Sequence, residues 1–202
     1  AGLSVTHTPP MPMSLVDVFD QMYADRFFYI LHFQAPGVAE AEFEADVRAS
    51  LKKIFHAGSA ATPLDAFLPD APRGDSFLSL LPEPPQGPLG FLSDADLDVY
   101  AETFARTGLT GAFNRYRALP LDGDALADIH GAKVSQPACF IGGAQDMVRS
   151  MVPGMDAYAR ADRGLADSRG VTIIDGAGHW VQQEAPDEVN AALHRFLQTL
   201  DH

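Results

Sequence analysis

Asp146 and His179 are the residues of this chain whose types and setting could activate a water molecule. Asp146 follows an apolar run, and His179 closes the glycine-rich segment Asp175–His179 ahead of a helical pattern. A carboxylate on one imidazole nitrogen fixes the tautomer and orientation of the ring, so that the other nitrogen can take a proton from water. Either residue alone would be an ordinary turn or loop residue. Together, in this order, they predict a hydrolytic site.

The elements around this pair indicate how it could assemble. Residues 137–141 and 171–174 are apolar runs that predict strands, and residues 150–161 predict a helix between them. Pro186 opens a final helix in which apolar residues share one face, namely Val189, Leu193, Phe196 and Leu200. Because ligands collect at the carboxyl edge of a parallel sheet, the loops that carry Asp146 and His179 are expected side by side at that edge.

The middle of the chain is mainly helical. Helical spacing predicts helices over residues 15–22, 39–55, 93–106 and 111–117, with Ser93 as an N-cap and Gly108 at the end of the third. Residues 69–88 are rich in proline and predict an irregular excursion, whereas residues 3–6 predict a strand and residues 124–129 a short helix. The fold class is therefore α/β, with a core at residues 1–11 and 119–202 and a mainly helical insertion at residues 12–118.

The composition argues against several kinds of partner. A formal net charge of −13 argues against nucleic acid and against an anionic membrane surface, because both attract clustered Lys and Arg. No apolar run is long enough to span a membrane. The single cysteine, Cys139, cannot form an internal disulfide, which favours a reducing cytoplasm, and its apolar surroundings predict a buried small side chain. No metal site is expected, because no metal-ligand spacing links the other histidines, His7, His32, His56, His130, His194 and His202.

Four stretches carry a family likeness: Phe33–Glu42, Leu92–Tyr100, Phe104–Arg117 and Gly178–Pro186. In this order they resemble the cap-domain signatures and the histidine loop of the soluble epoxide hydrolases, which have the α/β-hydrolase fold. The matches cover nearly the whole chain. The resemblance implies that the helical insertion is a cap, or lid, domain and that the flanking segments belong to the C-terminal part of an α/β-hydrolase core.

The resemblance also implies roles for two tyrosines, Tyr29 and Tyr116. Their hydroxyls would stabilise the alkoxide that develops when an epoxide ring opens, although a tyrosine on an apolar face is more often a core aromatic. The other tyrosines, Tyr23, Tyr100 and Tyr158, are expected to be structural. Candidate walls of an apolar substrate pocket, or else ordinary core residues, are Phe27, Phe33, Met147, Val148 and Trp180.

The family's nucleophile is an Asp on a tight strand-to-helix turn, and no such motif is present in this sequence. Ala1–Thr6 resembles the strand that follows the nucleophile helix, so we expect the N-terminal segment of the catalytic domain to be missing, cleaved or in a separate chain. The implied function is an epoxide hydrolase that forms a vicinal diol through a covalent ester on that Asp. Its expected partners are a small apolar epoxide and the N-terminal segment, and no metal or organic cofactor is needed.

Three rival functions stay open. A haloalkane or haloacid dehalogenase of the same fold would share the Asp and His but has no use for two cap tyrosines. A serine esterase would differ in the absent nucleophile turn. An inactive, truncated hydrolase could act as a binding module. The sequence leaves open which epoxide is preferred and whether the protein forms a homodimer.

Overall fold

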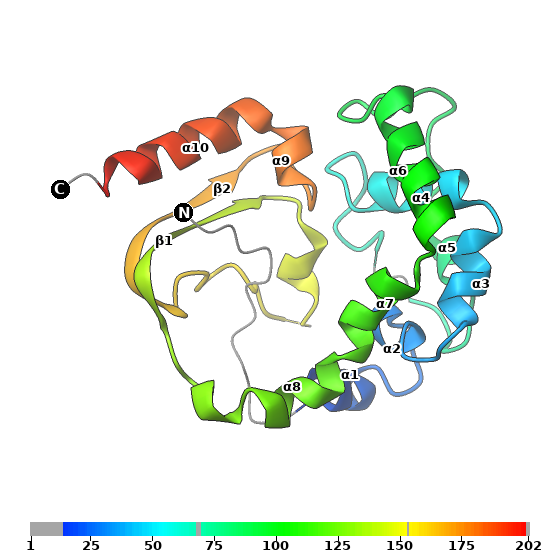
Figure 1. Cartoon of the computed structure of the whole chain (residues 1–202), viewed down its shortest axis with the longest axis horizontal. Coiled ribbons are helices and arrows are strands. Elements are labelled where there is room, and N and C mark those ends of the chain that lie inside the picture. Colours follow the sequence, from blue (N-terminus) through cyan, green and yellow to red (C-terminus); the bar gives the residue numbers. More distant parts are fainter. Residues whose placement is uncertain (1–13, 68–69, 153, 201–202) are drawn as a thin grey trace.

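Two parallel strands and the helices around them make up the part of the chain that the computed structural model describes, which is residues 14–67, 70–152 and 154–200 (Figure 1). The predicted strand Leu3–Thr6 and core segment 1–11 lie outside these residues. The helices that precede the strands are α1 (Leu15–Met22), α2 (Tyr29–His32), α3 (Val38–Glu44), α4 (Val47–Ala57), α5 (Phe77–Leu80), α6 (Asp94–Thr107), α7 (Thr110–Arg117), α8 (Leu119–Ala125) and the 3-10 turn η1 (Ala127–Ile129). The remaining elements are β1 (Val134–Gly143), η2 (Met147–Ser150), β2 (Leu165–Ile174), α9 (Val181–Glu184) and α10 (Pro186–Gln198).

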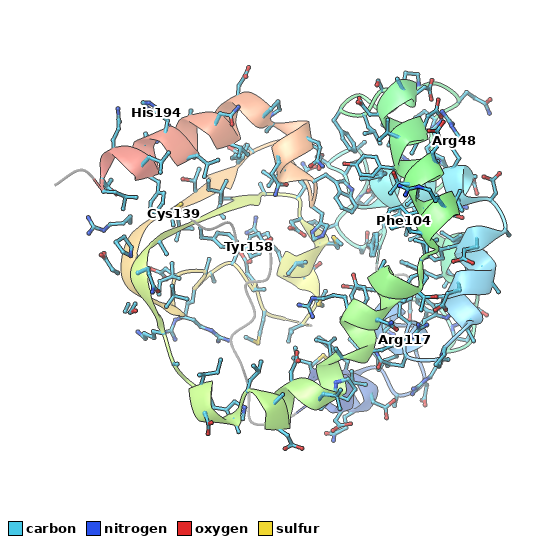
Figure 2. All side chains as sticks on the ribbon, in the orientation of Figure 1. Arg48, Phe104, Arg117, Cys139, Tyr158 and His194 are labelled. Carbon is cyan, nitrogen blue, oxygen red and sulfur yellow. The ribbon has the colours of Figure 1, made fainter. Side chains whose placement is uncertain are left out.

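The strands β1 and β2 pair in parallel, with Gly143 beside Ile174 at their carboxyl ends. Neighbouring residues of a strand face opposite sides of the sheet. The helix α10 covers one side, and Figure 2 places Cys139 between β1 and α10 and Tyr158 on the other side of β1. The carboxyl end of β1 leads to Asp146, and that of β2 leads to His179. The parallel pairing therefore brings both loops to one edge, as the sequence predicts.

An aromatic core joins the helices that precede the strands. Phe77 of α5 is fully buried, and the rings packed against it are those of Phe27, Tyr29, His32, Phe33, Phe43 and Phe67. Large aromatic side chains contribute most of the buried apolar area in such a cluster. A second cluster joins α4 to α6 through Leu51, Phe55 and Leu97. Figure 1 shows α3, α4, α5 and α6 gathered on one side, with β1, β2 and α10 on the other and α7 and α8 running between them.

Several predicted elements are confirmed. Helices occupy 15–22, 94–107, 110–117 and 186–198, and strands cover both predicted apolar runs. Ser93 caps α6 by accepting a hydrogen bond from the backbone N–H of Asp96 at 3.2 Å. Gly108 ends α6 with a φ of 72°, a conformation that favours glycine.

The single helix predicted over residues 39–55 is wrong, because the chain forms α3 and α4 instead. Between them Asp46 has extended backbone (φ −150°, ψ 91°), and its side chain accepts a hydrogen bond from the N–H of Ala49 at 3.0 Å. An aspartate in this position caps a new helix more favourably than it continues an old one. The break does not move the apolar face of α4, on which Leu51 remains buried.

The helix predicted over residues 150–161 is also wrong. The turn η2 ends at Ser150, Gly154 has a left-handed φ of 76°, and the carboxylate of Asp156 accepts from the backbone N–H of Tyr158 at 2.9 Å. Such side-chain hydrogen bonds offer the backbone an alternative to a helix.

Smaller corrections concern segment ends and burial. The proline-rich residues 69–88 contain the short helix α5. The single short helix predicted at 124–129 is wrong: these residues contain the end of α8, which has Pro120 in its first turn, and the separate 3-10 turn η1. Leu200 lies beyond α10 and is 41% exposed, and Cys139 is half-buried rather than buried. Among the described residues no helix is long and apolar enough to cross a bilayer.

Candidate active site

The structure brings Asp146 and His179 into direct contact. Nδ1 of His179 lies 3.0 Å from Oδ1 and 3.1 Å from Oδ2 of Asp146, across 33 positions of sequence. The side chain of Asp146 is 7% exposed and that of His179 is 35% exposed. The carboxylate is therefore shielded, while the imidazole reaches the surface of the described structure. This arrangement leaves Nε2 of His179 free of the carboxylate, as a water-activating base requires.

Local backbone geometry fixes Asp146. The residue is the N-cap of η2, and its Oδ1 accepts a hydrogen bond from the N–H of Val148 at 2.9 Å. Its Oδ2 accepts a hydrogen bond from the hydroxyl of Tyr158 at 2.6 Å. Burial raises the pKa of Asp146, but the hydrogen bond and charge of His179, together with the donors Tyr158 and Val148, outweigh it and lower that pKa below its ordinary value. Asp146 is thus held as a carboxylate.

Two glycines allow the histidine loop to approach β1 and the helical region closely. A Cβ at Gly143 would overlap the carbonyl oxygens of Ala177 and Gly178, and a Cβ at Gly178 would lie 2.6 Å from the backbone nitrogen of Ala60. The N–H of His179 donates to the carbonyl of Gly58 at 2.8 Å. The loop is therefore fixed from both sides by backbone contacts that only glycine permits.

Glu184 of α9 binds this loop to the helical region. Its Oε1 accepts hydrogen bonds from the N–H groups of Gly178 and Trp180, both at 3.1 Å, and its Oε2 accepts one from Ala60 at 2.7 Å. The indole Nε1 of Trp180 adds a hydrogen bond to the carbonyl of Phe55 at 2.9 Å. His179 lies between the two N–H groups that Glu184 binds, so its backbone position depends on this carboxylate.

Tyr29 begins α2 and Tyr116 lies near the end of α7, and their rings meet edge to face with centroids 5.9 Å apart. Burial raises the pKa of Tyr116 and raises that of Tyr29 well above its ordinary value, to which the charge of Asp146 also contributes. In the described parts of the chain neither hydroxyl makes a hydrogen bond, whereas those of Tyr23 and Tyr158 do. Both phenols therefore stay protonated with their donors available, and the buried Tyr29 lies near enough to Asp146 to be affected by its charge.

Gln34 and Arg117 hold the two tyrosine-bearing helices together. The amide of Gln34 donates to the carbonyls of Ile30 at 2.9 Å and Tyr116 at 3.1 Å. Arg117 donates through Nε to the carbonyl of Phe33 at 2.9 Å. Its two terminal nitrogens donate to the two carboxylate oxygens of Glu40 at 2.6 and 2.8 Å. Sequence reasoning assigned no role to these contacts, although Gln34, Glu40 and Arg117 all lie in the stretches that carried the family likeness.

The predicted wall residues have different surroundings. Phe33 is 5% exposed, and its ring contacts those of Tyr29 and Tyr116 with centroids 5.7 and 5.0 Å apart. Met147 is buried in the same aromatic cluster, next in sequence to Asp146. These two residues thus lie where a wall is needed.

The other three candidate wall residues make contacts that do not identify them as walls of a substrate pocket. Phe27 contacts the rings of His32 and Phe77 within the core and is 3% exposed, so it is a core residue. Val148 is half-buried and supplies its N–H to Asp146. The ring of Trp180 lies against His179, with centroids 5.0 Å apart, and against Phe55 at 4.8 Å, so it links the histidine to α4.

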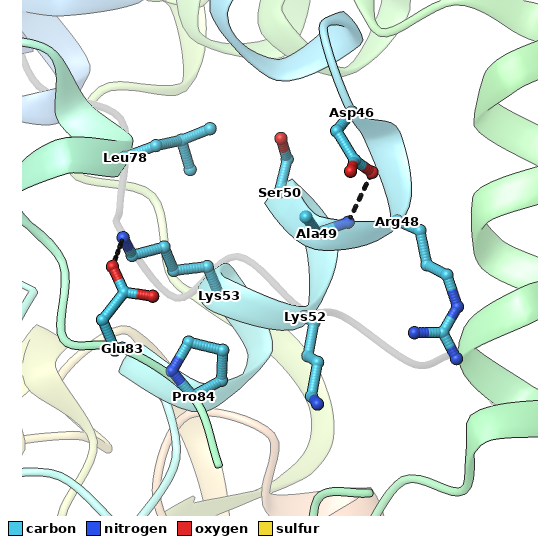
Figure 3. Close-up of a pocket in the computed structure, with 9 residues that line it drawn as sticks. All are labelled: Asp46, Arg48, Ala49, Ser50, Lys52, Lys53, Leu78, Glu83 and Pro84. Atoms are coloured by element: carbon cyan, nitrogen blue, oxygen red, sulfur yellow. Dashed lines mark hydrogen bonds and ion pairs between the residues drawn. The ribbon is translucent and has the colours of Figure 1, made fainter. Parts of the chain in front are cut away.

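An open cavity of about 360 Å³ lies away from this site (Figure 3). Of its charged side chains, Lys53 pairs with Glu83 at 2.5 Å and Arg48 pairs with Asp94 and Asp98 at 2.8 and 2.6 Å, while Lys52 donates to the carbonyl of Pro85 at 2.8 Å. No residue of the predicted site lines it, since its walls are Asp46, Arg48, Ala49, Ser50, Lys52, Lys53, Leu78, Glu83 and Pro84. Within the described ranges no cluster of His, Cys, Asp and Glu could hold a metal ion.

Comparisons with known proteins show the family of this chain. The model of the alpha/beta hydrolase family matches residues 21–192. Epoxide hydrolase A of Mycobacterium tuberculosis is 38% identical over 207 residues, which cover 100% of this chain and 61% of that protein. Epoxide hydrolase 1 of Siraitia grosvenorii is 36% identical, over 98% of this chain and 61% of that protein.

Solved structures give the same result. An epoxide hydrolase from an endophytic Streptomyces superposes with a TM-score of 0.86 at 39% identity, over 96% of this chain and 58% of that one. Epoxide hydrolase A from Mycobacterium thermoresistibile gives a TM-score of 0.80 at 37% identity, over 94% of this chain and 59% of that one. The chain spans about three fifths of the length of these relatives. It belongs to the alpha/beta hydrolase family, and the relatives that it matches along almost its whole length are epoxide hydrolases.

Proposed function

We propose that this chain is the lid and the C-terminal part of an epoxide hydrolase, which converts a small apolar epoxide into a vicinal diol. The observation that carries the proposal is the pair of phenols, the buried Tyr29 and the half-buried Tyr116, whose ring centroids lie 5.9 Å apart and whose hydroxyls have no partner within the described residues. Tyr29 lies in the same aromatic cluster as Met147, the residue after Asp146, and Tyr116 packs against that cluster. An oxyanion that develops there would meet two donors and, nearby, the His179–Asp146 pair.

In the first step a carboxylate attacks an epoxide carbon, the carbon–oxygen bond of the ring breaks and a covalent ester forms. Tyr29 and Tyr116 donate hydrogen bonds to the departing oxygen, and one of them gives it a proton. In the second step Nε2 of His179 takes a proton from water, and the resulting hydroxide attacks the ester carbonyl. The leaving alkoxide takes that proton back from the imidazolium, and the diol departs. The remaining proton, on the released carboxyl group, returns to the tyrosinate.

The nucleophile in this proposal is an Asp of an N-terminal segment outside this chain, which is therefore the first partner of the site. In this proposal the lid comprises residues 12–118, and the core comprises residues 1–11 and 119–202, as the sequence predicts. The single cysteine, Cys139, supports a reducing compartment such as the cytoplasm. The relatives named epoxide hydrolase support the substrate class.

The experiment is an assay of this chain joined to the N-terminal segment that supplies the nucleophile, with styrene oxide and 1-chlorohexane as alternative substrates. Diol formation without halide release is expected. Halide release without diol formation would favour a dehalogenase, and no turnover of either substrate would favour an inactive binding module. The chain without the added segment serves as the control and is expected to form no diol.

A further inference from the structure

Tyr158, which the proposed mechanism does not use, touches the acid of the Asp146–His179 pair. Its hydroxyl donates a hydrogen bond to Oδ2 of Asp146 at 2.6 Å. The sequence predicts only a structural role for this tyrosine, because the residues around it carry no catalytic pattern. Figure 2 shows Tyr158 on the side of β1 that faces away from α10. It reaches Asp146 from a segment 12 positions later in the sequence.

Both oxygens of Asp146 have a fixed donor besides the imidazole. Oδ1 accepts from the N–H of Val148 at 2.9 Å, and Oδ2 accepts from Tyr158. His179 Nδ1 is nearly equidistant from the two oxygens, at 3.0 and 3.1 Å. A carboxylate with one donor on each oxygen cannot rotate without losing a hydrogen bond, so its plane stays directed at the imidazole.

The tyrosine is itself held on several sides. Its N–H donates to Asp156 at 2.9 Å, its ring packs on Phe140 with centroids 4.8 Å apart, and the guanidinium of Arg149 lies 5.9 Å from its ring centroid. A Cβ at Gly142 would lie 2.7 Å from Cε2 of Tyr158, so the glycine makes room for the ring. The two glycines that end β1 thus make room for different neighbours. The missing side chain of Gly142 leaves space for the ring of Tyr158, and that of Gly143 leaves space for the backbone of the histidine loop.

We propose that Tyr158 is a positioning residue for ester hydrolysis: its hydroxyl fixes the carboxylate of Asp146 toward Nδ1 of His179 and limits how strongly that carboxylate attracts the imidazole proton. This inference rests on the proposed function, because it assigns Tyr158 to the second step of that reaction. The hydroxyl stays protonated as a donor, since burial, followed by the charge of Asp146, raises the pKa of Tyr158 far above its ordinary value.

The substitution Tyr158→Phe removes the donor and keeps the ring. Asp146 then loses one of the interactions that lower its pKa, and its carboxylate becomes a stronger acceptor for the proton on Nδ1 of His179. A histidine that is held more strongly in its charged form is a base only at higher pH. The ionisable groups that face Tyr158 and Asp146 are His179, Arg149 and Asp156, with Tyr29 on the helical side, and all of them are kept in the variant.

Three measurements on the protein joined to its nucleophile segment test the inference. In single-turnover experiments Tyr158→Phe is expected to leave ester formation unchanged and to slow ester hydrolysis roughly tenfold, the effect of losing one hydrogen bond to a charged group. The acidic limb of the pH profile for hydrolysis is expected to move to higher pH. In proton NMR the low-field resonance of the His179 Nδ1 proton, assigned by its loss in His179→Gln, is expected to move further downfield.

The matched control is Tyr23→Phe, which removes a hydroxyl that donates to the carbonyl of Met151 at 2.7 Å, outside the site. It is expected to change none of the three readouts. Gly142→Ala provides a second variant, because its methyl group displaces the ring of Tyr158 and should shift the Nδ1 resonance in the same direction.

The inference is overturned if Tyr158→Phe hydrolyses the ester at the parental rate with an unshifted resonance and pH profile. It is also overturned if both chemical steps slow equally while the resonance stays in place, since that pattern indicates a general structural effect. The NMR readout needs no turnover. A parent protein that forms no ester would therefore refute the proposed function while the contact between Tyr158 and Asp146 was still tested.

Discussion

The guanidinium of Arg117 binds both carboxylate oxygens of Glu40, at 2.6 and 2.8 Å, and joins two helices that are far apart in sequence. Arg117 follows Tyr116 in α7, and Glu40 lies in the first turn of α3, shortly after α2, which Tyr29 begins. The ion pair is largely shielded, with side chains 13% and 11% exposed. It therefore fixes the separation of the two proposed oxyanion donors.

Glu40→Gln is expected to destabilise the fold at neutral pH. The hydrogen bonds from Arg117 lower the pKa of Glu40 from 4.5 to about 2. A carboxylate whose pKa is depressed in the folded state stabilises that state above its unfolded pKa, and the stabilisation is lost as the pH falls through the folded pKa. We expect the variant to lose about 2 kcal/mol at pH 7, and the difference from the parent to shrink between pH 4.5 and 2.

Urea unfolding followed by circular dichroism at pH 7 and pH 3 measures this effect. The matched control is Glu102→Gln, at an exposed glutamate of α6, which is expected to change the free energy of unfolding very little. An equal loss for Glu40→Gln at both pH values would contradict the assignment of its pKa to Arg117.

Replacing either proposed donor, as Tyr29→Phe or Tyr116→Phe, is expected to slow ring opening roughly 100-fold in the complete enzyme, the usual cost of one oxyanion donor. Ester hydrolysis should change little, because the alkoxide has already been protonated by then. Pre-steady-state kinetics separate the two steps. Tyr100→Phe, on α6 in the other aromatic cluster, is the control and should retain both rates. Full ring-opening rates in both single variants would make the tyrosines core residues and would favour a dehalogenase.

His179→Gln is expected to trap the covalent ester. Ring opening needs no base at His179, whereas hydrolysis of the ester does. Intact-protein mass spectrometry should show a mass increase of one substrate molecule in the variant and none at steady state in the parent. His194→Gln, on the exposed side of α10, is the control and should turn over normally. A His179→Gln variant with normal turnover would refute the two-step mechanism.

Gly143→Ala is expected to separate the histidine loop from β1. Its methyl group would overlap the carbonyl oxygens of Ala177 and Gly178, which are backbone atoms and cannot rotate away. Overpacking of this kind costs about 1–3 kcal/mol, and the displaced loop should lose the Nδ1 contact with Asp146. Thermal unfolding and the His179 Nδ1 resonance report the two effects. Gly90→Ala is the control, since a Cβ there meets nothing within 4 Å; a similar loss in both variants would make the effect unspecific.

The sequence by itself determined the elements whose signals are local. Apolar or helical spacing predicted α1, α6, α7 and α10, and end signals added to it at α6, through Ser93 and Gly108, and at α10, through Pro186. The apolar runs predicted β1 and β2, and the order of Asp146 and His179 after them predicted where the pair would meet. The local pattern was misleading where a single aspartate competes with a helix, as Asp46 and Asp156 do.

Only the tertiary structure decided which side chains converge on the site from a distance. Tyr158 donates a hydrogen bond to Asp146, and Arg117 donates to Glu40. Glu184 accepts hydrogen bonds from the histidine loop and from Ala60. None of these contacts follows from the periodicity of the sequence. The pairs lie up to 124 positions apart, and a side-chain hydrogen bond depends on how whole elements pack. The same holds for Gly142 and Gly143, whose need to be glycine arises from a ring and a loop that the rest of the fold brings against them.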